Sequence, residues 1–204
     1  NLFSRALVLN AELHAKDLKI ITGSNQVVYE TGTATSIGSS STAPAFAIDS
    51  SSLGGMYANR IRLIGTEAGV GMRLAGPVAA MNGNLEITNS GDVRIVRASA
   101  KQAVSIRTDR DLAIDADGGI ERAGISSGAA LTLTAASGIT LADGVAVTGA
   151  ATRITSESIF TGNNSEIAAR DALTIEAENQ QLSGTIASQK TITMMGGDIA
   201  NRGN

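Results

Sequence analysis

Short alternations of apolar and polar residues recur along the chain from Asn84 to Asn204. A three-residue phrase with mostly apolar residues on either side of a polar one returns at spacings of 19, 27, 21, 21 and 19 residues. The phrase occurs at Leu85–Ile87, Val104–Ile106, Leu131–Leu133, Thr152–Ile154, Leu173–Ile175 and Ile192–Met194. Alternation with a period of two is typical of a strand with one buried face. Recurrence about every twenty residues indicates stacked structural repeats, so the pattern predicts a coil of short strands.

Turn residues separate each phrase from further alternating segments. After Leu131–Leu133 the chain continues with Ala135–Gly138, Ile139–Leu141, Asp143–Gly144 and Val145–Val147. Glycine and small polar residues supply the backbone angles that tight corners require, so we expect two or three strands in each repeat. Equivalent strands stacked about 4.8 Å apart would align the inward Leu, Ile and Val side chains into one long core.

The same pattern divides the chain into three parts. Residues 1–22 carry two apolar alternations and predict the first coil or coils. Residues 23–55 hold a short Val27–Tyr29 strand and a Ser/Thr/Gly-rich stretch that ends at Pro44, which predicts a loop or hairpin projecting from the solenoid. Residues 56–204 resume the periodicity, with surplus residues around Gly118–Gly128 that predict a surface loop. Because the pattern is already under way at Asn1, we expect the chain to be part of a longer protein.

Composition favours a narrow solenoid over a sandwich. The 204 residues are 43% hydrophobic and 17% charged but only 2% aromatic. Aromatic side chains normally supply much of the area buried in a globular core, so a mainly aliphatic core predicts a thin cross-section. A net charge of -3 disfavours nucleic acid and anionic membrane surfaces as partners. No apolar run reaches the length of a membrane span, and the lack of cysteine is compatible with both reducing and oxidising compartments.

Two runs of residues resemble a known family. The first extends from Arg5 to Val27, and the second extends from Ala47 to Gly71, with Leu53–Gly71 as its most specific part. They resemble the large exoproteins of two-partner secretion, which are the filamentous haemagglutinins and the contact-dependent growth inhibition proteins of Gram-negative bacteria. The repeats after Asn84 resemble haemagglutinin repeats. The resemblance implies a right-handed parallel β-helix, export by an outer-membrane transporter, and display as a filament, secreted or at the cell surface.

The densest group of carboxylates is a candidate metal site. A Ca²⁺ loop uses oxygen ligands at alternating positions, but the spacing here matches neither the EF-hand pattern nor the Gly-Gly-x-Gly-x-Asp repeat of calcium-binding β-rolls. We therefore expect solvated positions beside a turn, with no metal and no cofactor. The group consists of Asp109, Asp111, Asp115 and Asp117, followed by Gly118 and Gly119.

The histidine and glutamate residues of the sequence give little support for a catalytic function. His14 is the only histidine, so neither a repeated Ser-His-Asp triad nor a His-rich zinc site can be assembled. Glu12, Glu67 and Glu121 could each pair with an aspartate for glycoside hydrolysis, but no spacing singles out a pair.

Glycines and asparagines are expected at the corners of the coils. Gly65–Gly71 is rich in glycine but lacks the Lys-Ser/Thr of a phosphate-binding loop. Asparagine tolerates left-handed backbone angles, which places Asn82, Asn84, Asn163 and Asn164 at corners with a structural role.

These observations predict a structural and interaction module that is not an enzyme. We expect a filament segment that displays an adhesive or toxin-delivering tip, with an outer-membrane transporter and a receptor on a host or neighbouring cell as candidate partners. One alternative is an adhesin segment that binds a host receptor or glycan directly, for example through the projection at residues 23–55. A second alternative is a carbohydrate-active β-helix enzyme, which would need converging carboxylates and exposed aromatic residues.

Overall fold

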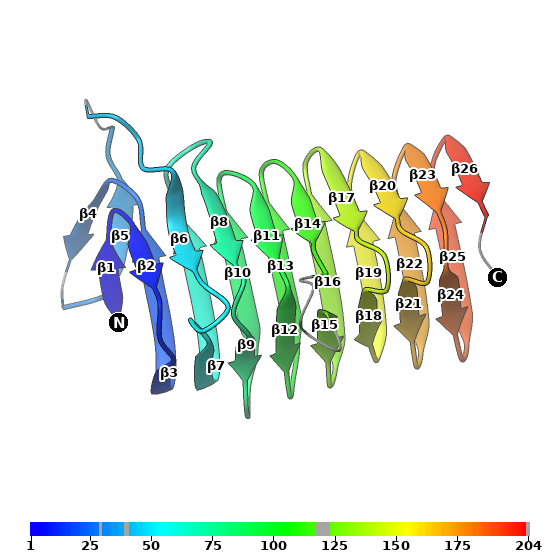
Figure 1. Cartoon of the computed structure of the whole chain (residues 1–204), viewed down its shortest axis with the longest axis horizontal. Helices are drawn as coiled ribbons and strands as arrows, with labels where there is room; N and C mark the ends of the chain where they lie inside the picture. The colour runs from blue at the N-terminus through cyan, green and yellow to red at the C-terminus, as the bar shows by residue number, and fades with distance from the viewer. Residues whose placement is uncertain (29, 39–40, 117–122, 203–204) are drawn as a thin grey trace.

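The chain forms a parallel β-solenoid, as the periodicity predicts. The computed structural model describes residues 1–28, 30–38, 41–116 and 123–202. All but two of its strands, β1 to β26, stack into about nine coils, and there is no helix among the described residues. Figure 1 shows the coils following one another along a single axis from the N-terminus to the C-terminus.

Most coils contribute one strand to each of three faces. The first face contains β9 (Val78–Ala80), β12 (Arg97–Ala100), β15 (Gly124–Ser127), β18 (Ala146–Gly149), β21 (Glu166–Ala169) and β24 (Thr185–Ser188). The second face contains β10 (Leu85–Asn89), β13 (Val104–Thr108), β16 (Ala130–Ala135), β19 (Ala151–Thr155), β22 (Ala172–Glu176) and β25 (Thr191–Met195). The third face is a nine-stranded sheet of β2 (Leu7–Leu9), β6 (Phe46–Ser50), β8 (Gly71–Leu74), β11 (Val93–Ile95), β14 (Leu112–Ile114), β17 (Gly138–Leu141), β20 (Ser158–Thr161), β23 (Asn179–Leu182) and β26 (Asp198–Asn201).

Two long strands join the first and second faces near the N-terminus. These strands are β3 (Leu13–Thr22) and β7 (Met56–Gly65), which pair with each other along most of their length. The start of β7 pairs with β9 and its end pairs with β10. The short strand β1 (Leu2–Ser4) pairs with the end of β3.

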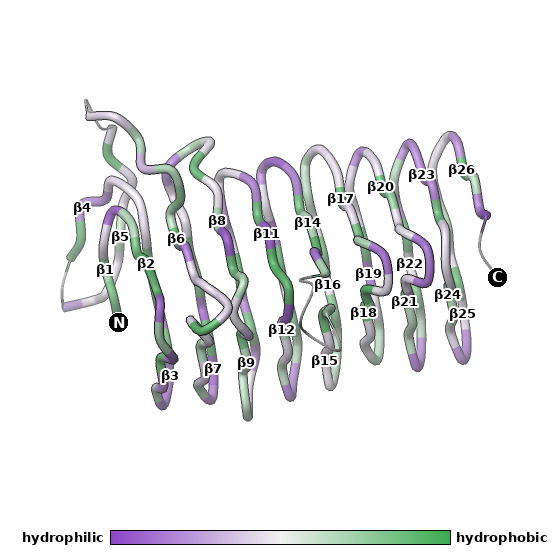
Figure 2. The backbone as a smooth tube through the Cα atoms, viewed as in Figure 1, coloured by the Kyte–Doolittle hydropathy of each residue, from purple (hydrophilic) through white to green (hydrophobic). Residues whose placement is uncertain are grey.

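Equivalent strands lie in register, so the recurring phrase forms a continuous row. On the second face Leu85 pairs with Val104, which pairs with Leu131, and the row continues through Thr152, Leu173 and Ile192. The alternation along each coil is visible in Figure 2 as interspersed green and purple segments. Parallel pairing with inward aliphatic side chains buries one face of every strand, which is the arrangement that the spacing predicts.

The core is aliphatic and extends along the solenoid from Leu18 to Leu182. Where β7 joins the second face and along that face, the side chains of Leu63, Leu85, Ile106 and Leu133 are fully buried. Residues of the third face close the core on another side, and the buried ones include Ile48, Met72, Leu74, Ile95, Leu112, Ile139 and Leu141. The core is therefore made of aliphatic rows, as the scarcity of aromatic residues predicts.

The range 23–55 contains both a projection and a strand of the solenoid. Strands β4 (Asn25–Val28) and β5 (Thr33–Ser36) form an antiparallel hairpin that is a sheet of its own. Strand β6, by contrast, pairs with β2 and β8 and buries Ala47 and Ile48. The solenoid therefore resumes at β6, earlier than the boundary at residue 55 that the sequence predicts. The pairing of β6 with β8 is interrupted between Phe46 and Ile48. The neighbouring residues Ala47 and Ile48 are both buried, so the strand lacks the alternation of the repeated phrase.

The surface loop that the sequence predicts around Gly118–Gly128 also contains a strand of the solenoid. Residues 117–122 lie outside the described residues. Gly124–Ser127 form β15, which pairs with β12 and β18 on the first face. The part of the predicted loop from Gly124 onward is therefore a solenoid strand, because Ile125 alternates inward and is buried.

Candidate functional site

A clamp of polar side chains ties the first coil to the base of the hairpin. The Arg5 guanidinium donates two hydrogen bonds to the Glu67 carboxylate, from Nε to Oε2 at 3.1 Å and from Nη2 to Oε1 at 2.8 Å. Arg5 Nη1 also donates to Ser41 Oγ at 2.6 Å. Thr66, beside Glu67, donates from Oγ1 to Asn25 Oδ1 at 2.8 Å. These contacts join the N-terminal coil, the hairpin and the corner after β7.

The clamp changes the proton affinity of its two charged groups. The hydrogen bond from Arg5 lowers the pKa of Glu67 below its ordinary value, and the same bond raises the pKa of Arg5. The ionised pair is therefore the stable form around neutral pH. Sequence reasoning missed this pair because 62 positions separate the two residues, and no local pattern connects them.

Further ion pairs connect neighbouring coils on the outer surface. Asp49 on β6 accepts two hydrogen bonds from Arg73 on β8, at 2.7 and 2.8 Å. Arg62 lies 3.3 Å from its register partner Glu86 on the second face. Exposed pairs of this kind each contribute little to the free energy of unfolding. Their charges are opposite across adjacent coils, which is compatible with stacking.

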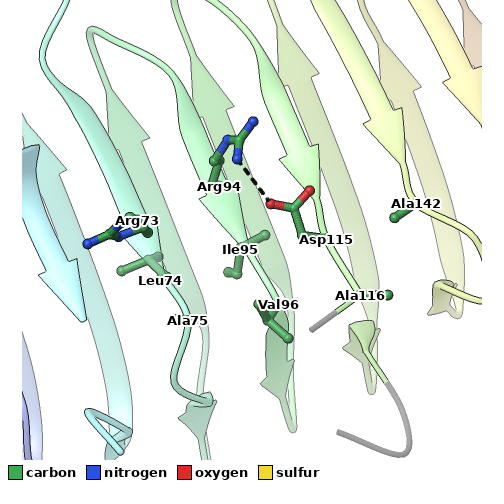
Figure 3. Close-up of a pocket in the computed structure, with 9 residues that line it drawn as sticks. All are labelled: Arg73, Leu74, Ala75, Arg94, Ile95, Val96, Asp115, Ala116 and Ala142. Carbon is green, nitrogen blue, oxygen red and sulfur yellow. Dashed lines mark ion pairs between the residues drawn. The ribbon is translucent and has the colours of Figure 1, made fainter. Parts of the chain in front are cut away.

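An open pocket of about 380 Å³ lies between the third and first faces. Figure 3 shows Arg94 and Asp115 pointing toward each other across it, with 3.8 Å between Arg94 Nη1 and Asp115 Oδ2. Arg73 is turned away and lies over the ring of Phe46, with 4.8 Å between the guanidinium carbon and the ring centroid. The remaining lining is apolar and consists of Leu74, Ala75, Ile95, Val96, Ala116 and Ala142.

The predicted acidic group is only partly described. Asp115 faces Arg94, and Asp109 and Asp111 are exposed at the corner between β13 and β14. Asp117, Gly118, Gly119 and Glu121 lie outside the described residues. In the part of the chain that the structure describes, no three His, Asp or Glu side chains are grouped so that they could hold a metal ion.

His14 lies on the outer surface of the first coil. Its ring stacks on Tyr57 at 5.0 Å between centroids and 15° between planes. Its Nε2 lies 3.0 Å from Glu12 Oε2. Of the three glutamates considered for glycoside hydrolysis, Glu67 is held by Arg5 and Glu12 lies beside His14. Glu67 and Glu12 therefore have different partners, and neither of these contacts pairs the glutamate with an aspartate.

The predicted asparagines and Gly69 lie at corners, whereas Gly65 is the last residue of β7 and Gly71 is the first residue of β8. Gly69 adopts a φ of +77° in the corner between β7 and β8. Asn164, with a φ of 56°, occupies the corner between β20 and β21 beside Asn163. Asn82 and Asn84 lie in the corner between β9 and β10.

The comparisons with known proteins agree on one family. Residues 1–95 match the TPS secretion domain. The chain is 30% identical over 222 aligned residues to the 16S rRNA endonuclease CdiA of Enterobacter cloacae subsp. cloacae, across 100% of this chain and 6% of that protein. It is 48% identical over 91 residues to the tRNA nuclease CdiA-2 of Burkholderia pseudomallei, across 45% of this chain and 3% of that protein. It is 38% identical over 129 residues to the toxin CdiA of Yersinia pestis, across 63% of this chain and 4% of that protein.

A parallel β-solenoid whose first coils match a secretion domain defines a class of secreted or cell-surface protein. The chain belongs to the two-partner secretion exoproteins of the contact-dependent growth inhibition type. It spans only 3 to 6% of the length of the relatives named above. No solved structure gives a significant match. Within the described ranges there is no helix that is long and apolar enough to cross a membrane.

Proposed function

We propose that the chain is a rigid spacer in a secreted exoprotein that displays an adhesive or toxin-delivering tip. The observation that carries the proposal is the register of equivalent strands, which is kept from coil to coil on all three faces after the interruption between β6 and β8. Each coil contacts only its neighbours, so length grows by about 4.8 Å with every coil. The toxin and nuclease names of the relatives support a tip that lies outside these coils.

We also propose that residues 1–95 direct export through an outer-membrane transporter. The match to the TPS secretion domain supports this assignment. Folding would begin at the first coils, where the Arg5–Glu67 clamp joins segments far apart in the sequence. Each completed coil then offers unpaired backbone groups to the next coil, which gives the folding a direction.

The spacer acts mechanically and not as a nuclease in this proposal. Carboxylates on its surface are engaged by basic side chains, as at Asp49 with Arg73 and Glu67 with Arg5. The hydrogen bond from Arg5 lowers the pKa of Glu67, which leaves that carboxylate poorly suited to act as a general acid.

The experiment is an export assay in a Gram-negative host that produces the chain with a reporter after residue 202. With the cognate transporter present, the reporter is expected outside the cell. A variant without residues 1–95 is expected to remain inside. Release that does not depend on residues 1–95 would contradict the export proposal, and cleavage of RNA by the purified chain would contradict its mechanical role.

A further inference from the structure

A polar groove lies at the corner where the first face meets the second, near the N-terminus. Its volume is about 490 Å³, and hydrogen-bonding side chains from successive coils line it. The main ones are Lys16, Asn59, Arg60, Asn82, Asn84 and Gln102. In the two coils that follow Gln102, the same corner carries only small residues, Gly128, Ala129 and Ala150. The polar lining of the groove therefore ends with the coil that contains Gln102.

Three asparagines in the groove present hydrogen-bond donors and acceptors. Asn82 donates from Nδ2 to Asn59 Oδ1 at 2.7 Å. This bond leaves the amide nitrogen of Asn59 as a donor and the carbonyl oxygen of Asn82 as an acceptor. Asn84 accepts from the backbone N–H of Ala103 at 3.1 Å, which leaves its own amide nitrogen as a second donor. Neighbouring hydroxyl groups, each both donor and acceptor, match this arrangement.

The lining of the groove carries two basic side chains, Lys16 and Arg60, and one acidic side chain, Asp17. Arg60 lies 3.8 Å from Asp17, while Lys16 has no ion-pair partner among the described residues. We propose that this groove binds a short oligosaccharide that contains a carboxylated sugar. The sugar hydroxyls bond Asn59 and Asn82, and the carboxylate lies near Lys16. The proposal is independent of the spacer function.

The test is a titration of the full chain followed by the NMR signals of the asparagine side-chain amides. The probes are sialyllactose, a lipopolysaccharide core oligosaccharide that carries deoxyoctulosonate, and neutral lactose. The two acidic probes distinguish a host source from a bacterial source. We expect at least one acidic probe to shift the Asn59 and Asn82 signals, with lactose binding about tenfold more weakly.

Variants locate the site. Asn82→Ala is expected to weaken binding about tenfold, while Gln189→Ala, at the same corner of a later coil, is expected to bind as the parent chain does. Circular dichroism checks that each variant is folded. Absence of shifts with both acidic probes, equal affinity for lactose, or unchanged binding by folded Asn82→Ala would overturn the proposal.

Discussion

At the scale of single residues, buried polar side chains hold the corners of the coils. Asn89 is 1% exposed and donates from Nδ2 to the carbonyl oxygens of Val70 and Asp92, both at 3.0 Å. Gly65 is its register partner on β7, and a Cβ atom at Gly65 would collide with Asn89 Oδ1. The two residues are complementary in size, so glycine is required here by a close approach.

Gly65→Ala is expected to destabilise the chain by about 1–3 kcal/mol, because overpacking a well-packed core has that cost. Asn89→Ala is expected to cost about 1–3 kcal/mol, because two carbonyls lose their donor. The double variant should be less destabilised than the sum by about 1 kcal/mol or more. Urea unfolding measures the free energy of unfolding of the two single variants and the double variant. Strictly additive changes would show that the two residues do not interact.

Glu67 makes stability depend on pH in the acid range. Because Arg5 lowers its pKa in the folded chain, the pair stabilises the fold above the ordinary glutamate pKa of about 4.3. That contribution is lost as the pH falls through the lowered value. Glu67→Gln is therefore expected to be less stable than the parent chain at neutral pH and to approach it in acid. Unfolding curves across pH test this, and a difference that grows in acid would contradict it.

At the scale of elements, alternation decides which side chains the strands bury. Leu133 on β16 is 0% exposed and lies in register between Ile106 and Ile154. Leu133→Lys places an unpaired charge in this row, and a cost above about 4 kcal/mol is expected from such burial. The control Ser105→Lys changes an exposed position on β13 and should remain folded. Circular dichroism and solubility separate the two, and a folded Leu133→Lys variant would contradict the register.

The strands whose positions follow from local alternation could be predicted from sequence. The rows at Leu85, Val104 and Leu131 are examples, because the same phrase returns in each coil. Strand β6 could not be separated from the projection, because its burial depends on pairing with β2 and β8 and not on a repeated phrase. The clamp and the groove also depend on side chains brought together only by stacking.

At the scale of the whole molecule, the coils act as interchangeable units of length. Residue Leu131 pairs with Thr152, and Thr152 pairs with Leu173. Deleting residues 131–172 therefore removes two coils and joins Ala130 to Leu173 in the register that Leu131 had. Deleting residues 131–141 instead removes most of β16 and all of β17 and breaks the succession of faces.

The most direct measurement is the distance between spin labels on Arg62→Cys and Thr193→Cys, which are free of competing thiols because the chain has no cysteine. Six successive register pairings lead from one labelled position to the other on the second face. At about 4.8 Å for each pairing, the expected distance in the intact chain is about 29 Å. The two-coil deletion is expected to keep its β-structure and shorten this distance by about 10 Å, while deletion of residues 131–141 should unfold the coils. An unchanged distance, or loss of structure on removing two whole coils, would contradict the account of the chain as a stacked spacer.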